Sequence, residues 1–226
     1  MNNSRRFWVT GSTNGLGTAL VEHLVAQQQR VAASGRNNLQ FHAMARRQGS
    51  RMLALPGAPQ TGGEYLQQAW GALDTLIVNA GTCDYLPTQI TESQLVHAVI
   101  KTNMQAFEQF LEAALPLLER GERPQLVVIL NLYTVSQLSD PSLPPSPSNS
   151  LPCRLEQLRP QLQEAGIDLT VITPHAQHAP WAIDPIPERW TAQTAATEIL
   201  GRLPERQQEV VLEALGLRAL WPLMSI

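Results

Sequence analysis

Lysine is almost absent from this sequence of 226 residues: of its 16 lysines and arginines, only Lys101 is a lysine. The arginines are scattered and the net charge is −3, so the sequence does not predict a basic surface for nucleic acid. Cysteine is scarce too. Cys83 and Cys153 are too few and too far apart for a disulfide framework or a zinc knuckle, and no metal site is predicted. Two cysteines favour a reducing, cytoplasmic compartment.

Long apolar runs are also missing. No stretch reaches the ~18 residues of a membrane span, and the first twenty residues lack the apolar core of a signal peptide, so neither is predicted. Aromatic residues make up only 5% of the chain, and its tryptophans are spread along it, which favours packing roles over a surface that stacks nucleic-acid bases. With 43% hydrophobic residues, the chain is long enough to bury the core of one compact domain.

Short apolar runs alternate with amphipathic stretches, a pattern typical of repeated βαβ units. Right-handed crossovers would place helices on both faces of the sheet, so the sequence predicts an α/β fold, a single doubly wound domain with a parallel sheet of six to seven strands. The expected strands are Arg6–Thr10, Arg30–Ser34, Arg51–Leu55, Leu73–Asn79, Gln125–Leu132, Asp168–Thr173 and Glu209–Leu212. The expected helices are Gly15–Gln28, Leu39–Gln48, Gly63–Gly71, Glu92–Glu119 (with Thr91 and Gln94 as a capping box), Leu151–Ala165 and Thr191–Leu203.

A glycine cluster lies where the first expected strand turns into the first helix. Gly11, Gly15 and Gly17 would let the backbone turn tightly and let phosphate oxygens approach the amides at a helix N-terminus. Such a turn can also serve only to pack a helix on a strand. The cluster gains weight from its place at the first junction and from the sequence Asn79-Ala80-Gly81 after the fourth expected strand.

Together, TGSTNGLG at residues 10–17 and Asn79-Ala80-Gly81 resemble the short-chain dehydrogenase/reductase family, whose members transfer hydride to or from NAD(P). The resemblance covers roughly residues 5–212 and implies a Rossmann-type dinucleotide-binding domain. The implied cofactor-binding residues are Thr10, Gly11, Ser12, Thr13, Asn14, Gly15, Leu16, Gly17, Arg36, Asn79, Ala80, Gly81 and Pro174.

Arg36 bears on the choice of cofactor. Family members specific for NAD usually carry an acidic residue at the end of the second strand, whereas a basic residue there favours the 2′-phosphate of NADP. Arg36 therefore favours NADP(H) over NAD(H), although an ordinary surface arginine would look the same. After the third strand the family commonly has an aspartate that contacts adenine, but this chain reads Leu55-Pro56-Gly57-Ala58. Backbone groups would have to hold the base.

The family's catalytic pair is a tyrosine followed four residues later by a lysine, and no such pair occurs here. No lysine follows Lys101. Counting back from the segment around the sixth strand places Asn131 at the position of the family's catalytic serine, Pro144 at that of the tyrosine and Ser148 at that of the lysine. Only Asn103 matches the tetrad, as the asparagine of the fourth helix.

The expected nicotinamide end differs as well. After Pro174 the chain has His175, where the family usually has glycine, and Ala179 in place of a threonine that holds the carboxamide. Tyr133 is the leading replacement acid, while Tyr85, His175 and His178 are alternatives. Without a lysine, a phenol with an ordinary pKa near ~10 would be a poor base at pH 7.

Three further segments have two interpretations each. The proline-rich segment at residues 139–152 is expected to be an exposed, irregular loop that delays the next helix until about Ser150, or a cover over the site. The apolar stripe of Met104, Phe107, Phe110, Leu111 and Ala114 is expected at a subunit contact by family resemblance, or in the core. Residues 1–212 would form the domain, and the apolar tail, residues 213–226, would pack on it or on a partner subunit.

Three functions remain open from the sequence. The leading hypothesis is a dinucleotide-binding protein with an eroded catalytic tetrad, which binds NADP(H) for sensing, regulation or assembly and forms a homodimer or homotetramer. The second is an active oxidoreductase on a carbonyl or alcohol substrate, in which Asn103 and Asn131 orient the substrate and Tyr133 or a histidine supplies the proton. The third is a partner-binding protein whose glycine turn is a relic.

Overall fold

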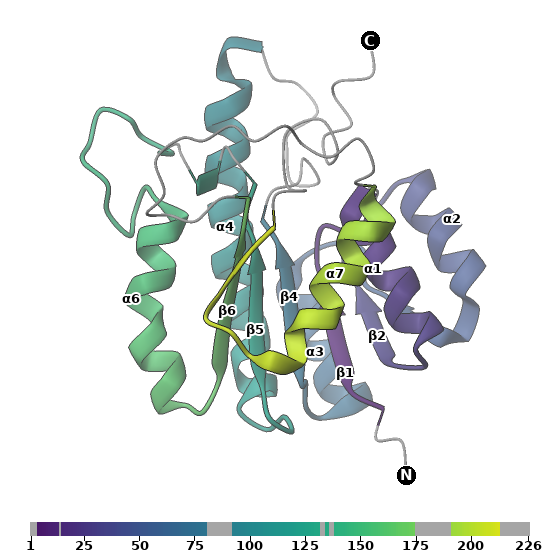
Figure 1. Cartoon of the computed structure of the whole chain (residues 1–226). Helices are drawn as coiled ribbons and strands as arrows, with labels where there is room; N and C mark the ends of the chain where they lie inside the picture. The colour runs from purple at the N-terminus through teal and green to yellow at the C-terminus, as the bar shows by residue number, and fades with distance from the viewer. Residues whose placement is uncertain are drawn as a thin grey trace.

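Seven parallel strands form one sheet at the centre of the molecule, in the order β3-β2-β1-β4-β5-β6-β7 (Figure 1). The computed structural model describes residues 4–13, 15–80, 92–131, 134–135, 138–174 and 191–212. Each predicted strand is present, within two residues at either end or three for β5. The strands are β1 (Arg6–Val9), β2 (Arg30–Ala33), β3 (Met52–Ala54), β4 (Thr75–Asn79), β5 (Gln125–Ile129), β6 (Asp168–Thr173) and β7 (Glu209–Val211).

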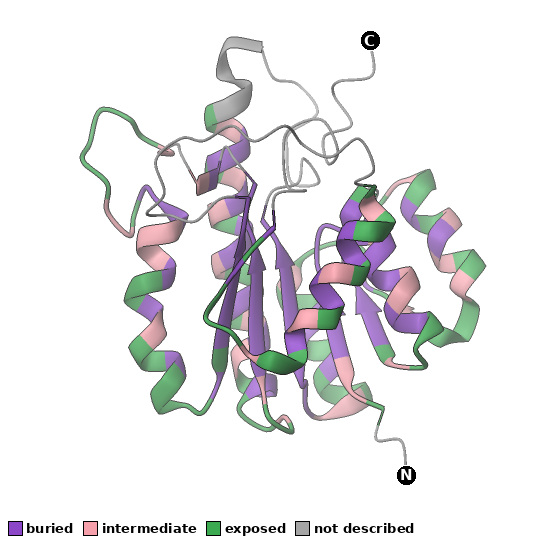
Figure 2. Ribbon diagram, viewed as in Figure 1, coloured by how far each residue is buried: buried purple, intermediate pink, exposed green. Residues whose placement is uncertain are grey.

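Helices cover both faces of this sheet, as the crossover rule requires. One layer consists of α1 (Gly15–Ala26), α2 (Leu39–Gln48) and α7 (Ala192–Arg202), and the other of α3 (Pro59–Trp70), α4 (Glu92–Leu118) and α6 (Leu151–Glu164). Strand β1 shows how one sequence supplies two cores. Phe7 and Val9 pack into the first core, while Trp8 between them points to the other face and packs into the second. The central strands of the sheet are accordingly buried, as their purple ribbons in Figure 2 show.

Helix α3 begins four residues earlier than predicted, at Pro59 rather than Gly63. Proline suits the first helical position because its fixed φ is already helical and its missing N–H has no helical partner there. Gly63 looked like a helix start, but it lies inside the helix because α3 and α4 approach closely. A Cβ on Gly63 would lie 2.9 Å from the carbonyl oxygen of Ala113 on α4. The glycine therefore serves packing between helices.

The apolar stripe of α4 belongs to the core, which corrects the expectation of a subunit contact there. Phe107, Phe110, Leu111 and Ala114 are all buried against the sheet and α6, and Met104 packs beside them. Apolar side chains that are buried against the sheet cannot also form a contact with a second subunit. The predicted capping residue of α4, Thr91, lies outside the described residues.

The proline-rich segment is an ordered loop held by Asn149. The Asn149 side-chain nitrogen donates to the carbonyls of Asp140 and Pro144, and its oxygen accepts from the Ser146 amide. Helix α6 then begins at Leu151, with Ser150 as its N-cap, which confirms the prediction that no helix starts before about Ser150. The loop's middle, residues 141–145, is exposed as expected. The apolar tail, residues 213–226, lies outside the described residues.

No helix in the described part of the chain is both long and apolar enough to cross a bilayer.

Candidate functional site: a dinucleotide cleft

The glycine-rich turn joins the carboxyl end of β1 to the first turn of α1. The Thr10 amide continues the sheet by donating to the Ile77 carbonyl of β4, and the chain then turns at Gly11, whose φ is +63°. Residues with a Cβ rarely adopt this backbone conformation, which explains the glycine. The Ser12 side chain is buried and donates to the Val9 carbonyl, so the turn is fixed from inside.

Gly17 brings the first turn of α1 against that loop. A Cβ at Gly17 would lie 2.0 Å from the Gly11 carbonyl oxygen and 2.9 Å from the Ser12 Cα, both closer than any real contact. The Thr18 hydroxyl adds a bond to the Ser12 carbonyl at 3.0 Å. The helix N-terminus, with its unpaired amides and positive dipole end, therefore lies directly behind the loop, in the arrangement that binds a diphosphate.

Asn79, the last residue of β4, holds the turn from the neighbouring strand. Its side-chain nitrogen donates to the Gly11 carbonyl at 3.4 Å, and its backbone amide donates to the Thr10 hydroxyl at 3.3 Å. The next residue, Ala80, is fully buried and its amide donates to Ile129 of β5. These contacts explain why β4 ends with an asparagine and why a small residue follows it.

Thr13 connects the turn to the segment after β2. The Arg36 amide donates to the Thr13 hydroxyl at 2.8 Å, and the Ser12 amide donates to the Ser34 carbonyl at 3.0 Å. Between them, Gly35 leaves no room for a side chain, because a Cβ there would lie 2.7 Å from the Thr13 hydroxyl. The backbone of Arg36 is thus fixed relative to the glycine-rich turn, while its side chain is exposed.

A cleft of about 460 Å³ opens beside Arg36, at the carboxyl ends of β2 and β3. Its walls are the segment at residues 34–37, the segment at residues 57–60 and one face of α4. No carboxylate occurs among the described residues that line it, so nothing there opposes an anion. The volume falls within the ~300–1,000 Å³ typical of small-molecule sites. The cleft fits the adenosine end of a dinucleotide whose diphosphate rests on the glycine turn.

The predicted catalytic asparagines are buried, and their side chains bond to nearby backbone. Asn103 on α4 donates to the Val99 carbonyl of its own helix at 2.8 Å. Asn131, just beyond β5, accepts from the Thr134 amide at 2.9 Å, while the Thr134 hydroxyl accepts from the Asn131 amide, also at 2.9 Å. This reciprocal pair has the form of a capping box and orders the turn after β5. The described contacts of Asn103 therefore lie within α4, and those of Asn131 lie within the turn after β5.

The positions counted as replacing the tyrosine and lysine lie on the exposed part of the proline-rich loop. Pro144 accepts from Asn149 through its carbonyl, and the Ser148 hydroxyl bonds only with that of Ser146 among the described contacts. Pro174 directly follows β6 and is buried, at the same sheet edge as the glycine turn. Several predicted residues lie outside the described part: Asn14, Gly81, Tyr85, Tyr133, His175, His178 and Ala179.

Sequence reasoning missed the contribution of α4 and of Ser34. Trp8 donates its ring N–H to the Ser34 hydroxyl at 2.9 Å, and Ser34 in turn lines the cleft. The residues of α4 that line the cleft recur at helical spacing, which was the available signal: Thr102, Gln105, Ala106, Gln109 and Phe110.

Comparison with known proteins agrees with this geometry. The sequence model of short chain dehydrogenases matches residues 6–139, more than half of the chain. The chain therefore belongs to the short chain dehydrogenase family, as its glycine turn and its Asn79 element predicted.

Among curated relatives, the cis-1,2-dihydrobenzene-1,2-diol dehydrogenase of Pseudomonas putida is 27% identical over 135 residues, which is 54% of this chain and 49% of that protein. The chain thus matches about half the length of this relative. A bovine (Bos taurus) protein, dehydrogenase/reductase SDR family member 7B, is 25% identical over 225 aligned residues, covering 92% of this chain and 69% of its own.

Solved structures show the same fold. A short-chain dehydrogenase from Streptomyces avermitilis superposes with a TM-score of 0.69 at 16% identity, covering 93% of this chain and 89% of its own. A metagenomic short-chain oxidoreductase, solved in complex with NADP, superposes with a TM-score of 0.64 at 18% identity, covering 92% of this chain and 96% of its own.

Proposed function

We propose that this protein binds NADP(H) and acts through that binding, in sensing, regulation or assembly, with little or no dehydrogenase turnover. The observation that carries the proposal is the network linking Asn79, the glycine turn and the backbone of Arg36. It supports the proposal that a diphosphate binds at the N-terminus of α1 and that the adenosine end occupies the cleft that Arg36 lines.

The residues present fit this cofactor. Helix α1 begins directly at the turn, Gly17 leaves no side chain between helix and loop, and the cleft beside Arg36 carries no carboxylate among its described lining. A guanidinium is planar and always charged, which suits a 2′-phosphate. Support for NADP also comes from the structural relative that was solved with it. When bound, the cofactor would supply or accept hydride; this chain's residues would bind and orient it.

Weak turnover is inferred from the missing acid and base. No lysine follows Lys101, so no tyrosine in this sequence has the lysine four residues later whose ammonium lowers the pKa of the family's catalytic tyrosine. The positions counted for that pair hold Pro144 and Ser148, and neither side chain can relay a proton as a phenol and an ammonium do. Asn103 and Asn131 would orient a substrate only in the second candidate, an active oxidoreductase.

A second candidate is an active oxidoreductase with a different acid, and the dehydrogenase relatives favour it. In that case Tyr133 or a histidine after Pro174 would supply the proton, with a carbonyl or alcohol as substrate. We also propose a cytoplasmic homodimer or homotetramer, residues 1–212 as the domain, and the tail as a helix packed on it or on a partner subunit.

Fluorescence titration with NADPH and NADH tests binding. We expect a dissociation constant below ~100 µM for NADPH and at least ~10-fold weaker binding of NADH. Absence of NADPH binding at ~1 mM would refute the proposal. Turnover is measured separately, as NADPH oxidation over a panel of carbonyls and quinones; rates above ~1 s⁻¹, the low end for ordinary enzymes, would favour the second candidate.

A further inference from the structure

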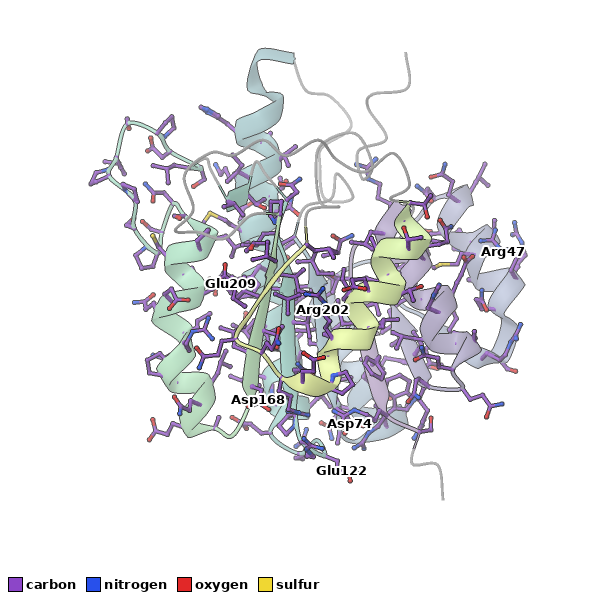
Figure 3. The ribbon with its side chains drawn as sticks, viewed as in Figure 1. Arg47, Asp74, Glu122, Asp168, Arg202 and Glu209 are labelled. Atoms are coloured by element: carbon purple, nitrogen blue, oxygen red, sulfur yellow. The ribbon has the colours of Figure 1, made fainter. Side chains whose placement is uncertain are left out.

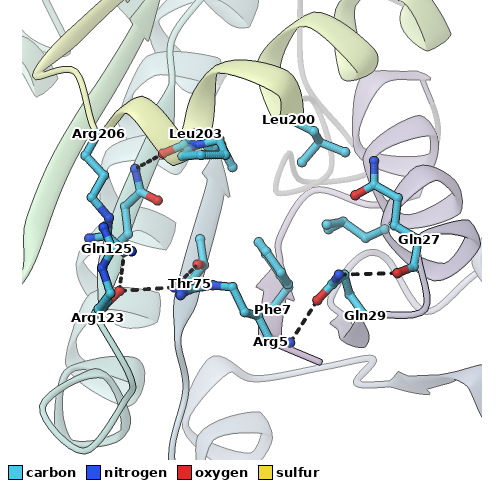
Figure 4. Close-up of a pocket in the computed structure, with 12 residues that line it drawn as sticks. Arg5, Phe7, Gln27, Gln29, Thr75, Arg123, Gln125, Leu200, Leu203 and Arg206 are labelled. Atoms are coloured by element: carbon cyan, nitrogen blue, oxygen red, sulfur yellow. Dashed lines mark hydrogen bonds between the residues drawn. The ribbon is translucent and has the colours of Figure 1, made fainter. Parts of the chain in front are cut away.

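A second pocket lies at the amino ends of the strands, whereas the cofactor cleft lies at their carboxyl ends. It has a volume of about 270 Å³ and opens at the amino ends of β1, β4 and β5 (Figure 4). Arg5 precedes β1, Thr75 and Gln125 are the first residues of β4 and β5, and the end of α7 closes the pocket from above. We call this space the amino-edge pocket. Nothing in the proposed cofactor site uses it.

Two guanidinium groups meet at one carbonyl in the wall of this pocket. The Arg123 carbonyl accepts from Arg5 at 3.0 Å and from Arg206 at 2.5 Å. Arg5 also donates to the Thr75 hydroxyl at 3.5 Å. The side chain of Arg123 itself lines the pocket and donates no hydrogen bond to any described residue. Three arginines from three separate segments therefore surround one space.

The carboxylates nearby are held outside the pocket. Asp74 accepts from both the guanidinium and the backbone amide of Arg6, and it also accepts from the Glu122 amide. Asp74 and Glu122 are labelled at the lower end of the molecule in Figure 3. Asp168 pairs with Arg206. Neither lines the pocket, and no acidic residue occurs in its described lining. Because Asp168 pairs with Arg206, the positive charge that faces the pocket comes mainly from Arg5 and Arg123, for which no salt bridge occurs among the described residues.

Burial lowers the pKa of Arg5; Asp74 raises it, and the charges of Arg206 and Arg123 lower it further. The Arg5 guanidinium is therefore desolvated and repelled by its neighbours. A bound anion beside Arg5 would offset both effects, because it would stabilise the charged guanidinium.

Two arginines of this wall adopt a backbone conformation that favours glycine. The φ angles of Arg123 and Arg206 are +49° and +54°, and these are two of the three described non-glycine residues with positive φ. Elsewhere in the chain, comparable turns at Gly49, Gly71 and Gly166 use glycine. Glycine adopts this backbone conformation at a lower energy than arginine, so an arginine in it indicates a role for the side chain. Strained backbone conformations are also enriched at binding sites.

The opposite wall is apolar. It is formed by Phe7, Leu24, Leu200, Leu203 and Pro204. Gln27 and Gln29 complete that side, where the Gln29 side chain accepts from the Arg5 amide and donates to the Gln27 carbonyl (Figure 4). A free inorganic ion would leave this apolar surface exposed to water, whereas an organic anion with an apolar body would cover it. The volume lies just below the ~300 Å³ at which sites for drug-sized molecules begin, so the occupant is smaller.

We propose that the amino-edge pocket is a binding site for a small organic carboxylate, with the carboxylate among Arg5, Arg123 and Arg206 and the apolar body against Phe7 and Leu200. Arginine suits this role because its planar fork of N–H donors matches the two oxygens of a carboxylate. The ligand class follows from the pairing of a cationic wall with an apolar one.

Three probes separate the parts of this proposal. Benzoate carries charge and apolar body, benzamide carries the body without charge, and inorganic phosphate carries charge without the body. Each is titrated into the ¹⁵N-labelled full chain and followed by the amide shifts of residues at the pocket. We expect saturable benzoate binding with a dissociation constant of ~10 mM or tighter, and at least ~10-fold weaker binding of the other two probes.

Arg123→Asn is the matched variant. Asparagine tolerates a left-handed backbone, and the Arg123 side chain makes no described hydrogen bond, so folding should be unaffected. Benzoate affinity should fall at least ~5-fold. The control, Arg51→Gln, removes an exposed arginine just before β3, four strands from β5 in the sheet order, and should leave affinity within ~2-fold. No saturation by benzoate, equal binding of benzamide or phosphate, or an unchanged Arg123→Asn variant would each overturn the proposal. None of these outcomes depends on NADPH binding.

Discussion

The side-chain nitrogen of Asn79 donates to the carbonyl of Gly11, a contact between residues 68 positions apart in the chain. Asn79 ends β4, and Gly11 lies just past the end of β1, the adjacent strand. The bond therefore holds the glycine-rich turn against β4 and helps to orient the backbone amides of the turn. Its effect on cofactor binding is indirect, through the shape of the loop.

Replacement of Asn79 by aspartate tests this bond. The change keeps the size of the side chain but places an oxygen against the Gly11 carbonyl, so a buried donor is exchanged for a repulsive contact. We expect a loss of ~1–3 kcal/mol in unfolding free energy, measured by urea denaturation, together with weaker NADPH binding. Asn38→Asp is the control, because the N-cap side chain of Asn38 uses its oxygen, which aspartate retains. Equal stability of the two variants would contradict this account.

Gly17→Ala should damage the cofactor turn. Its new Cβ would overlap the Gly11 carbonyl at 2.0 Å, so helix or loop must move. We expect a destabilisation of ~1–3 kcal/mol and at least ~10-fold weaker NADPH binding by fluorescence titration. Gly201→Ala provides the matched change in a helix with open space, since no atom lies within 4 Å of a Cβ there. That variant should gain ~0.5–1 kcal/mol and bind normally.

Arg36→Gln should change cofactor preference without changing the fold. The backbone amide of Arg36 bonds to Thr13, and the substitution preserves that bond. Loss of the guanidinium should weaken NADPH at least ~10-fold, about 1.4 kcal/mol, and leave NADH within ~2-fold. Arg46→Gln, an exposed arginine on α2, should alter neither affinity. If the two cofactors lose affinity equally in Arg36→Gln, the arginine does not read the 2′-phosphate.

Stability should fall in acid through Asp74. Burial raises the pKa of this carboxyl, but hydrogen bonds from the Arg6 side chain and from the Arg6 and Glu122 amides outweigh it and hold the pKa below the usual 3.8. A carboxyl whose folded pKa is lowered stabilises the fold above its unfolded pKa, and this contribution disappears as the pH falls through the folded value. The loss should therefore begin below pH ~4.

Asp74→Asn should flatten that dependence. The variant keeps the side-chain shape but loses the charge that pairs with Arg6, so at pH 7 it should be less stable by ~1–3 kcal/mol. Chemical denaturation between pH 7 and the acid limit measures both effects. Glu156→Gln removes an exposed pair with Arg159 and should cost under ~0.5 kcal/mol. An unchanged acid slope in Asp74→Asn would assign the acid loss to other groups.

Features that depend on residues close together in the sequence could be predicted, whereas contacts between residues far apart in the chain could not. The strands were legible because buried parallel strands are apolar runs, and all seven were located. The start of α3 was misplaced because Gly63 packs against α4, a contact between residues 50 positions apart that leaves no local signal. The α4 stripe was periodic, but periodicity does not say whether a sheet or a second subunit covers it.

The sequence by itself determined the α/β class, the position of the phosphate turn and the lack of a tyrosine and lysine pair, because composition, spacing and glycine placement are local properties. Only the tertiary structure decided that Thr13 fixes the backbone of Arg36, that α4 lines the cleft beside Arg36 and that three scattered arginines meet at the amino ends of the strands. The physical reason is that a parallel sheet aligns strand ends far apart in the chain, so both edges collect residues that no local pattern connects.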